Sequence, residues 1–142
     1  MSTADGFDRL VVNVDGGARG NPGPAAIGVV VATDDGLVVD EHGETIGRAT
    51  NNVAEYRALL AGIERARALG GKRLELLGDS ELVVKQVQGA YKVKNADLKP
   101  LHAQVRKALA ELDGWEIRHI KRAANAEADR LVNEALDASP RR

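Results

Sequence analysis

Apolar and polar residues alternate near the start of the chain, over 9–15, and the turn-forming segment DGGARGNPGP follows. This pattern predicts a β-strand that ends at Asp15 and runs into a loop. Two further hydrophobic stretches, 26–32 and 37–46, flank the turn formers at 33–36. Together these segments predict an antiparallel meander of three strands.

From Asn52 onward apolar residues recur at helical spacing, and Gly70-Gly71 ends the pattern as a helix terminus would. The later segments are predicted as a strand over 73–78, a helix over 80–88, a helix over 98–112, a strand over 115–120, a helix over 125–136 and a frayed tail from Ala138 to Arg142. The order β-β-β-α-β-α-α-β-α predicts an α/β fold, in which helices cover both faces of a mixed five-stranded sheet.

Composition narrows the class of protein. A chain of 142 residues with 44% hydrophobic and 29% charged residues fits one domain over 1–142, with an ordered core over about 8–137. Cysteine is absent, which excludes disulfides and thiolate metal sites. No apolar run approaches the ~20 residues of a membrane span, and the N-terminus does not resemble a signal peptide, so we expect a cytoplasmic protein. The net charge of −1 means that nucleic-acid binding would depend on local donors and metal ions.

Four acidic residues stand where hydrophobic runs meet turns or helices. Asp15 follows LVVNV, Glu55 lies just inside a helix, Asp79 follows LELLG, and Asp129 lies in the last helix. Strand ends and helix starts are where α/β proteins carry their chemistry, and converging carboxylates without basic partners require a hard divalent cation. The pattern therefore suggests one metal site assembled from distant segments.

Each acid also has an ordinary structural explanation. Asp15 could open an Asp-Gly turn. Asn52 and Glu55 fit a capping box at the start of their helix. Asp79 could cap the helix that follows it, and Asp129 could belong to a solvated helix face.

The four acids stand in motifs that resemble the type 1 ribonuclease H family, which cuts the RNA strand of RNA/DNA hybrids. The matching segments are VDGGARGNPGPAAIG, GRATNNVAEY, LLGDSELVVKQ and RAANAEADRL, and they cover nearly the whole chain in the family's order. The resemblance implies the ribonuclease H-like fold. The short segment QGAYKVKNADLKPL is similar to a compact subgroup that lacks a long basic protrusion, so we expect no substrate grip by such an element.

The resemblance implies catalysis by two Mg²⁺ ions, with Mn²⁺ as a plausible substitute. Asp15 would bridge the ions, Asp129 would complete the site that activates water, and Glu55 and Asp79 would hold the ion facing the leaving group. The products would carry 5′-phosphate and 3′-hydroxyl ends. Without metal the clustered carboxylates would repel one another, so metal binding should release protons.

Other positions match the family's contacts with the minor groove of the hybrid. Asn21, Asn51 and Asn52 would hydrogen-bond sugars and base edges, although turn formation and capping are their structural alternatives. The backbone at Gly16 and Gly17 would approach the RNA strand, because the missing side chains permit close contact. The 2′-hydroxyl groups would distinguish RNA from DNA.

A second group matches contacts with the DNA strand. Arg48, Thr50 and Asn95 resemble the family's pocket for a phosphate of that strand. Tyr91, flanked by lysines, could pack against a deoxyribose or base in place of an aromatic residue on the missing protrusion; core packing is its alternative.

One departure from the family concerns histidine. Many members place a histidine on a loop before the last acidic helix, but here only 121–124 separate the predicted strand from Asn125. His119 is expected within that strand and outside the catalytic set. We expect water, a metal ion or a nearby charged group to take over its role. Lys121 and Arg122 are interpreted as a solvated strand end, and Trp115 as a core residue.

The leading hypothesis is a monomeric, metal-dependent endonuclease that acts on RNA/DNA hybrids. A noncatalytic hybrid-binding module is the first alternative, and the retention of all four acids argues against it. A nuclease of the same fold that acts on double-stranded RNA or a branched DNA junction is the second. The paired asparagines and the phosphate pocket favour the hybrid, since the fold alone does not decide the substrate.

Overall fold

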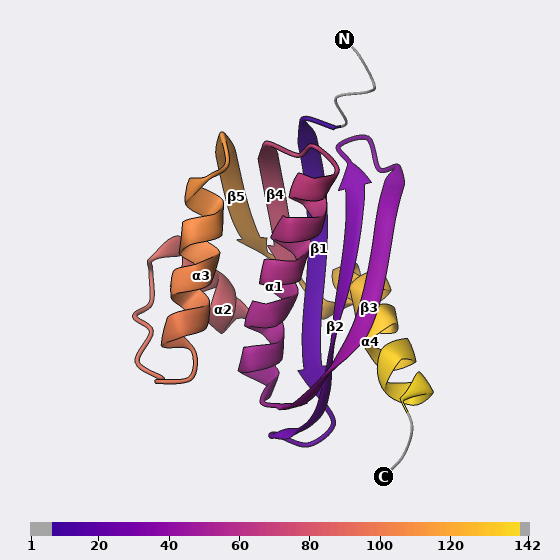
Figure 1. The fold of residues 1–142 in the computed structure, drawn as a ribbon, viewed down its shortest axis with the longest axis vertical. Coiled ribbons are helices and arrows are strands. Elements are labelled where there is room, and N and C mark those ends of the chain that lie inside the picture. The colour runs from indigo at the N-terminus through magenta and orange to yellow at the C-terminus, as the bar shows by residue number, and fades with distance from the viewer. Residues whose placement is uncertain (1–6, 140–142) are drawn as a thin grey trace.

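The sheet at the centre of the molecule has the strand order β3-β2-β1-β4-β5 (Figure 1). The computed structural model describes residues 7–139. Its elements are β1 Arg9–Ala18, β2 Gly23–Thr33, β3 Val38–Ala49, α1 Asn51–Ala68, β4 Arg73–Gly78, α2 Glu81–Gln88, α3 Lys99–Ala110, β5 Gly114–His119, the short 3₁₀-helix η2 Arg122–Asn125, and α4 Ala126–Ala138. β1, β2 and β3 form the expected antiparallel meander, whereas β4 and β5 continue the sheet in parallel with β1.

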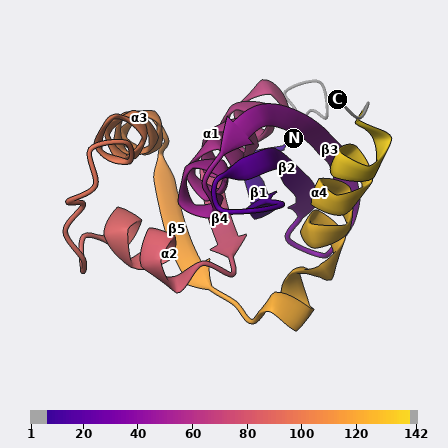
Figure 2. The ribbon, with the colours of Figure 1, turned by 90° about the horizontal axis from the view of Figure 1, so that it is seen from below.

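Helices cover both faces of the sheet, as predicted. Figure 2 shows α1 on one side of β1 and β2 and α4 on the other. The alternation along β1 explains this division, because successive side chains of a strand point to opposite faces. Leu10, Val12 and Val14 are buried in the main core together with residues of α1. On the other face, Ala26 and Val30 of β2 pack against α4 in two small clusters.

The first strand is longer than predicted and corrects the interpretation of its glycines. β1 continues to Ala18, and Gly16 and Gly17 pair with Ile27 and Ala26 of β2. Asp15 therefore lies inside a strand and does not open a turn. A Cβ atom on Gly16 would lie 2.2 Å from the carbonyl carbon of Ala54, so glycine is needed where α1 crosses the strand.

Two helix caps also differ from the sequence prediction. Thr50 caps α1, because its hydroxyl accepts a hydrogen bond from the Val53 amide at 3.2 Å. The capping box of Asn52 and Glu55 is therefore wrong. Ser80, not Asp79, caps α2 by accepting from the Val83 amide at 3.3 Å. Neither Glu55 nor Asp79 therefore serves as part of a helix cap.

The chain termini lie partly outside the described residues, which exclude 1–6 and 140–142. Residues 1–6 hold most of the segment that was considered for a signal peptide. Residues 140–142 are the end of the expected tail. α4 extends to Ala138, so the expected tail does not begin at that residue. None of the helices within 7–139 has the length and hydropathy required to cross a membrane.

Candidate active site

Three carboxylates from distant segments meet at one end of the sheet. Oxygen atoms of Asp15, Glu55 and Asp79 all lie within 4.8 Å of one another. The parallel register explains part of this convergence: Val14 of β1 pairs with Gly78 of β4, so the next residue of each strand is an acid at the same edge. Glu55 reaches the same point from the first turns of α1.

Glu55 is held in place by the strand that it approaches. The backbone amide of Gly16 donates a hydrogen bond of 2.6 Å to Glu55 Oε1. Since Gly16 has no side chain, α1 can come close enough for this bond to form. Asp15 and Glu55 are both buried, with 7% and 6% of their surface exposed. The two acids therefore face the site from fixed backbone positions and with little solvent around them.

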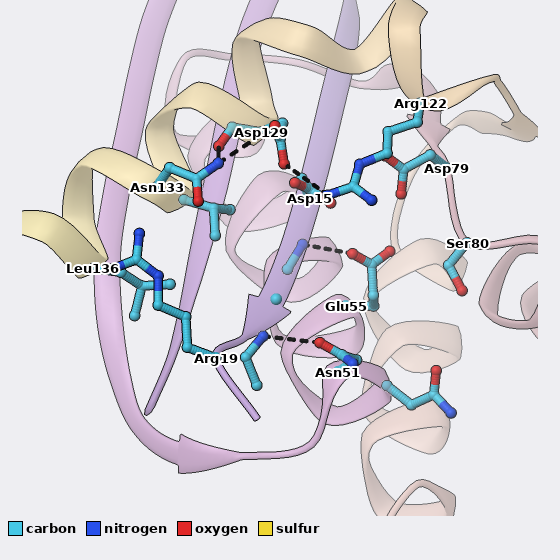
Figure 3. A pocket seen from close by; sticks show the side chains of 15 residues that line it. Asp15, Arg19, Asn51, Glu55, Asp79, Ser80, Arg122, Asp129, Asn133 and Leu136 are labelled. Atoms are coloured by element: carbon cyan, nitrogen blue, oxygen red, sulfur yellow. Dashed lines mark hydrogen bonds and ion pairs between the residues drawn. The ribbon is translucent and has the colours of Figure 1, made fainter. Parts of the chain in front are cut away.

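Asp129 enters the site from the opposite side. It lies in the first turn of α4 and turns toward Asp15 in Figure 3. It does not belong to the group of three whose oxygens lie within 4.8 Å of one another. One guanidinium nitrogen of Arg122 lies 3.7 Å from Asp129 Oδ1. The site thus has three clustered acids and a fourth on a separate helix.

The electrostatics of the cluster are unfavourable without a cation. Burial raises the pKa of Asp15 to about 7, and the neighbouring charge of Asp79 adds to the rise. Burial also raises the pKa of Glu55 well above its ordinary value, with a further contribution from Asp15, while the Gly16 amide acts in the opposite direction. Converging carboxylate oxygens of this kind fit a hard, oxygen-binding divalent ion. The residues present therefore suit Mg²⁺ or Mn²⁺.

The acids line an open cavity of about 400 Å³. Its wall includes most of the residues that the sequence proposed for the minor groove: Gly16, Gly17, Asn51 and Asn52. Asn51 Oδ1 accepts from the backbone N–H of Ala18 at 2.9 Å, and the backbone N–H of Asn51 donates to Asn21 Oδ1 at 3.0 Å. These bonds fix both asparagines by their carbonyl oxygens. Within 7–139 their Nδ2 groups have no protein acceptor, so they remain able to donate.

The residues predicted to hold a DNA phosphate do not share one contact. Thr50 uses its hydroxyl to cap α1. Arg48 lines a different hollow, with Pro24 and Leu136. Asn95 Oδ1 accepts from the Asp97 amide at 2.7 Å within its own loop. The predicted phosphate pocket therefore remains a prediction.

Tyr91 lies on the surface, which rules out the core-packing alternative. Its side chain is 46% exposed, and Lys85 Nζ lies 6.0 Å from the centre of its ring. Trp115 packs against the main core, as predicted, with the guanidinium of Arg106 over its ring at 5.3 Å. An exposed aromatic ring beside a cation is available for contact with a sugar or base.

Several residues of the site fall outside the set predicted from the sequence. Arg122, predicted as part of a solvated strand end, has a side chain that lines the cavity (Figure 3). Arg19, Ser80 and Asn133 also line the cavity. Asn125 is 1% exposed and hydrogen-bonds Val14, next to Asp15. The position of Arg122 between the last strand and the acidic helix was the available signal.

The three histidines lie away from the acids. His119 is the last residue of β5, within the strand where the sequence predicts it. His42 contacts Glu44 of its own strand at 2.9 Å. A ring nitrogen of His102 lies 3.1 Å from the backbone oxygen of Gln86. None of the three lines the cavity of the acids.

Comparisons with known proteins agree with this geometry. Residues 13–135 match the family model described as "Reverse transcriptase-like". The chain is 52% identical over 129 residues to a protein named Ribonuclease HI of Halobacterium salinarum, covering 91% of this chain and 65% of that protein. A bifunctional protein of Mycobacterium tuberculosis is 47% identical over 132 residues, or 92% of this chain and 36% of its own length. The chain thus spans only part of these curated relatives.

Solved structures give the same result. RNase H1 from Halobacterium salinarum matches with a TM-score of 0.90 and 50% identity, covering 92% of this chain and 99% of that one. LC11-RNase H1, solved in complex with an RNA/DNA hybrid, matches with a TM-score of 0.86 and 45% identity, covering 90% and 96% of the two chains. The similarity therefore includes the complete fold, in addition to the acidic motifs.

Proposed function

Because this chain belongs to the type 1 ribonuclease H family, we propose that it hydrolyses the RNA strand of RNA/DNA hybrids and leaves 5′-phosphate and 3′-hydroxyl ends. The observation that carries the proposal is the convergence of Asp15, Glu55 and Asp79 from three segments at one end of the sheet. The hybrid complex of LC11-RNase H1 supports the choice of substrate.

The four acids have distinct tasks in this proposal. Asp15 would be the ligand common to two Mg²⁺ ions, for which Mn²⁺ could substitute. Glu55 and Asp79 would hold the ion on the leaving-group side, and Asp129 would complete the site on the attacking side. When bound, the ions would supply positive charge for the attacking and leaving oxygens of an in-line displacement. The chain's own contribution is to hold the carboxylates in position, as the Gly16 amide does for Glu55.

The wall of the cavity and Asn21, which contacts Asn51 of that wall, provide donors for the minor groove of the hybrid. The Nδ2 groups of Asn21 and Asn51, together with Asn52, offer hydrogen bonds to sugars and base edges. The backbone at Gly16 and Gly17 allows the RNA strand to approach the acids, and its 2′-hydroxyl groups supply the discrimination from DNA. Since these contacts involve neutral groups, they suit a chain with a net charge of −1.

The DNA strand is assigned to a second set of residues. Tyr91, with Lys92 and Lys94 beside it, contacts a deoxyribose or base from the segment between α2 and α3. Arg48, Thr50 and Asn95 provide the phosphate contact, and Asn95 can donate through Nδ2 while its Oδ1 still accepts from the Asp97 amide. We further propose that the chain acts as a monomer. We also propose a cytoplasmic location, because a cysteine-free composition suits a reducing compartment.

The test is cleavage of a hybrid in which each strand carries its own label, with Mg²⁺, Mn²⁺ or EDTA, beside the variant Asp15→Asn. We expect metal-dependent cleavage of the RNA strand only, reduced at least 100-fold in the variant because the shared ligand is lost. RNA duplex and DNA duplex serve as matched substrates. Binding of an intact hybrid under every metal condition would instead identify a noncatalytic binding module, and preferential cleavage of another duplex would identify a different nuclease.

A further inference from the structure

Asn125 joins two of the acid-bearing segments to the helix that carries a third acid. Its Nδ2 group donates to the backbone oxygen of Val14 at 2.8 Å and to Asp79 Oδ2 at 3.4 Å. Val14 precedes Asp15 in β1, and Asn125 directly precedes α4, which carries Asp129. A single amide group, on the residue before α4, therefore contacts both β1 and the acid that follows β4.

The local geometry shows that Asn125 does not serve its own helix. Asparagine at the residue before a helix ordinarily accepts a hydrogen bond from the first turn. At Asn125 the side chain makes no such bond. Asn13 Nδ2 instead donates to Asn125 Oδ1 at 3.0 Å. That bond determines which end of the Asn125 amide faces the site, because only the nitrogen end can donate to Val14 and Asp79.

Burial makes the arrangement rigid. Asn125 is 1% exposed, so its polar atoms have no solvent to replace these partners. The bond to the backbone of Val14 ties the start of α4 to the strand that carries Asp15. The longer contact leaves Asp79 partly free to turn toward a cation while limiting its other orientations.

We propose that Asn125 is a positioning residue for the metal site, oriented by Asn13, and that it sets the placement of Asp79 and Asp129 relative to Asp15. This inference rests on the proposed function, because it assumes that the acids bind divalent metal. Residues that orient metal ligands from behind commonly change metal affinity by about 10–100-fold when they are replaced. Asn125 acts through the carboxylates and need not touch metal or substrate itself.

The experiment measures Mn²⁺ affinity without nucleic acid, by electron paramagnetic resonance and calorimetry, in wild type, Asn125→Ala and Asn13→Ala. We expect the Mn²⁺ dissociation constant to rise about tenfold in Asn125→Ala. A rise of at least threefold is expected in Asn13→Ala, which leaves the Asn125 amide in place but removes the bond that orients it. Val105→Ala is the matched control, because Val105 is fully buried in α3 and belongs to the main core. It should lower the unfolding temperature without changing Mn²⁺ affinity.

The outcomes separate the two hypotheses. If wild type binds no Mn²⁺, the proposed function fails. If wild type binds Mn²⁺ and both asparagine variants bind within twofold of it, the positioning role is overturned and Asn125 is only a structural residue. Should Asn125→Ala fail to fold, Asn13→Ala decides the question by the same threshold.

Discussion

Arg122 places a permanent positive charge beside the acid on α4. Its guanidinium lies 3.7 Å from Asp129. The charge can hold Asp129 in place and attract the phosphate that leaves the site, so Arg122 is a candidate for the nearby charged group that the sequence predicts in place of a loop histidine. We predict that Arg122→Ala lowers the rate of hybrid cleavage about tenfold, and that Arg122→Lys restores part of it, because an exposed ion pair contributes on the order of 1 kcal/mol.

Steady-state cleavage rates would check this prediction against Arg118→Ala as the control. Arg118 is also an exposed arginine, but it pairs with Glu75 at 3.0 Å and lies outside the cavity. An equal loss of activity in both variants would indicate a general effect of surface charge and would contradict a specific role for Arg122.

The contrast between the acids and their supporting residues shows how far sequence reasoning reaches at this scale. Asp15 and Asp79 are predictable because each follows a recognisable apolar run, and parallel pairing of β1 with β4 then places both at one end of the sheet. Asn125 has no comparable local signal, since its bond to Val14 joins residues 111 positions apart. Arg122 resembles any charged residue after a strand until α4 is docked beside it.

At the scale of elements, the docking of α4 depends on two glycines of the sheet. A Cβ atom on Gly28 of β2 would lie 2.2 Å from the carbonyl oxygen of Ala128, and one on Gly43 of β3 would lie 2.8 Å from that of Leu131. The helix therefore rests with its backbone directly against the strands. Gly28 also pairs with Asp15, so the contact lies beside the active site.

We predict that Gly28→Ala displaces α4 and with it Asp129. Because backbone atoms cannot yield as a flexible side chain would, overpacking should cost about 1–3 kcal/mol and lower the unfolding temperature by roughly 5–10 °C. Cleavage should fall at least tenfold, since the metal site is sensitive to small displacements. Circular dichroism melting and cleavage assays would measure both effects.

Gly114→Ala in β5 is the matched control for this prediction. The same methyl group there would meet only the Arg73 side chain, at 3.7 Å. We expect its melting temperature and activity to stay close to wild type. A wild-type level of activity in Gly28→Ala would show that the site tolerates a displacement of α4. It would contradict the proposed need for glycine where α4 contacts β2.

Element boundaries were predicted well where one pattern dominated and poorly where two residues could serve the same purpose. β4 begins and ends at the predicted residues. At the start of α1, Thr50 and Asn52 are both good capping residues. The bonds of Asn51 to Ala18 and Asn21 fix the register, and Thr50 becomes the cap. Those partners lie at the end of β1 and in the loop after it, and they are not visible in a local pattern.

At the scale of the whole molecule, the acidic site opposes folding when metal is absent. The pKa of Asp15 is about 7 in the folded chain, mainly through burial, against an ordinary value of 3.8. The pKa of Glu55 is raised in the same direction. Between about pH 4 and pH 7 the folded chain therefore holds protons that the unfolded chain has released, and the free energy of unfolding falls as pH rises. For Asp15 alone the loss is on the order of 4 kcal/mol.

We predict that the melting temperature of wild type in EDTA is higher at pH 5 than at pH 8, and that Mg²⁺ at pH 8 raises it again. A ligand at 100 times its dissociation constant stabilises by about 2.7 kcal/mol, which offsets much of the loss. Asp15→Asn removes the titrating group, so it should melt above wild type at pH 8 in EDTA and respond little to Mg²⁺. Differential scanning calorimetry at both pH values, with and without Mg²⁺, measures all four conditions.

A wild-type melting temperature that rises from pH 5 to pH 8 in EDTA would mean that the acids do not carry uncompensated charge. A Mg²⁺ response retained in Asp15→Asn would move the metal away from Asp15.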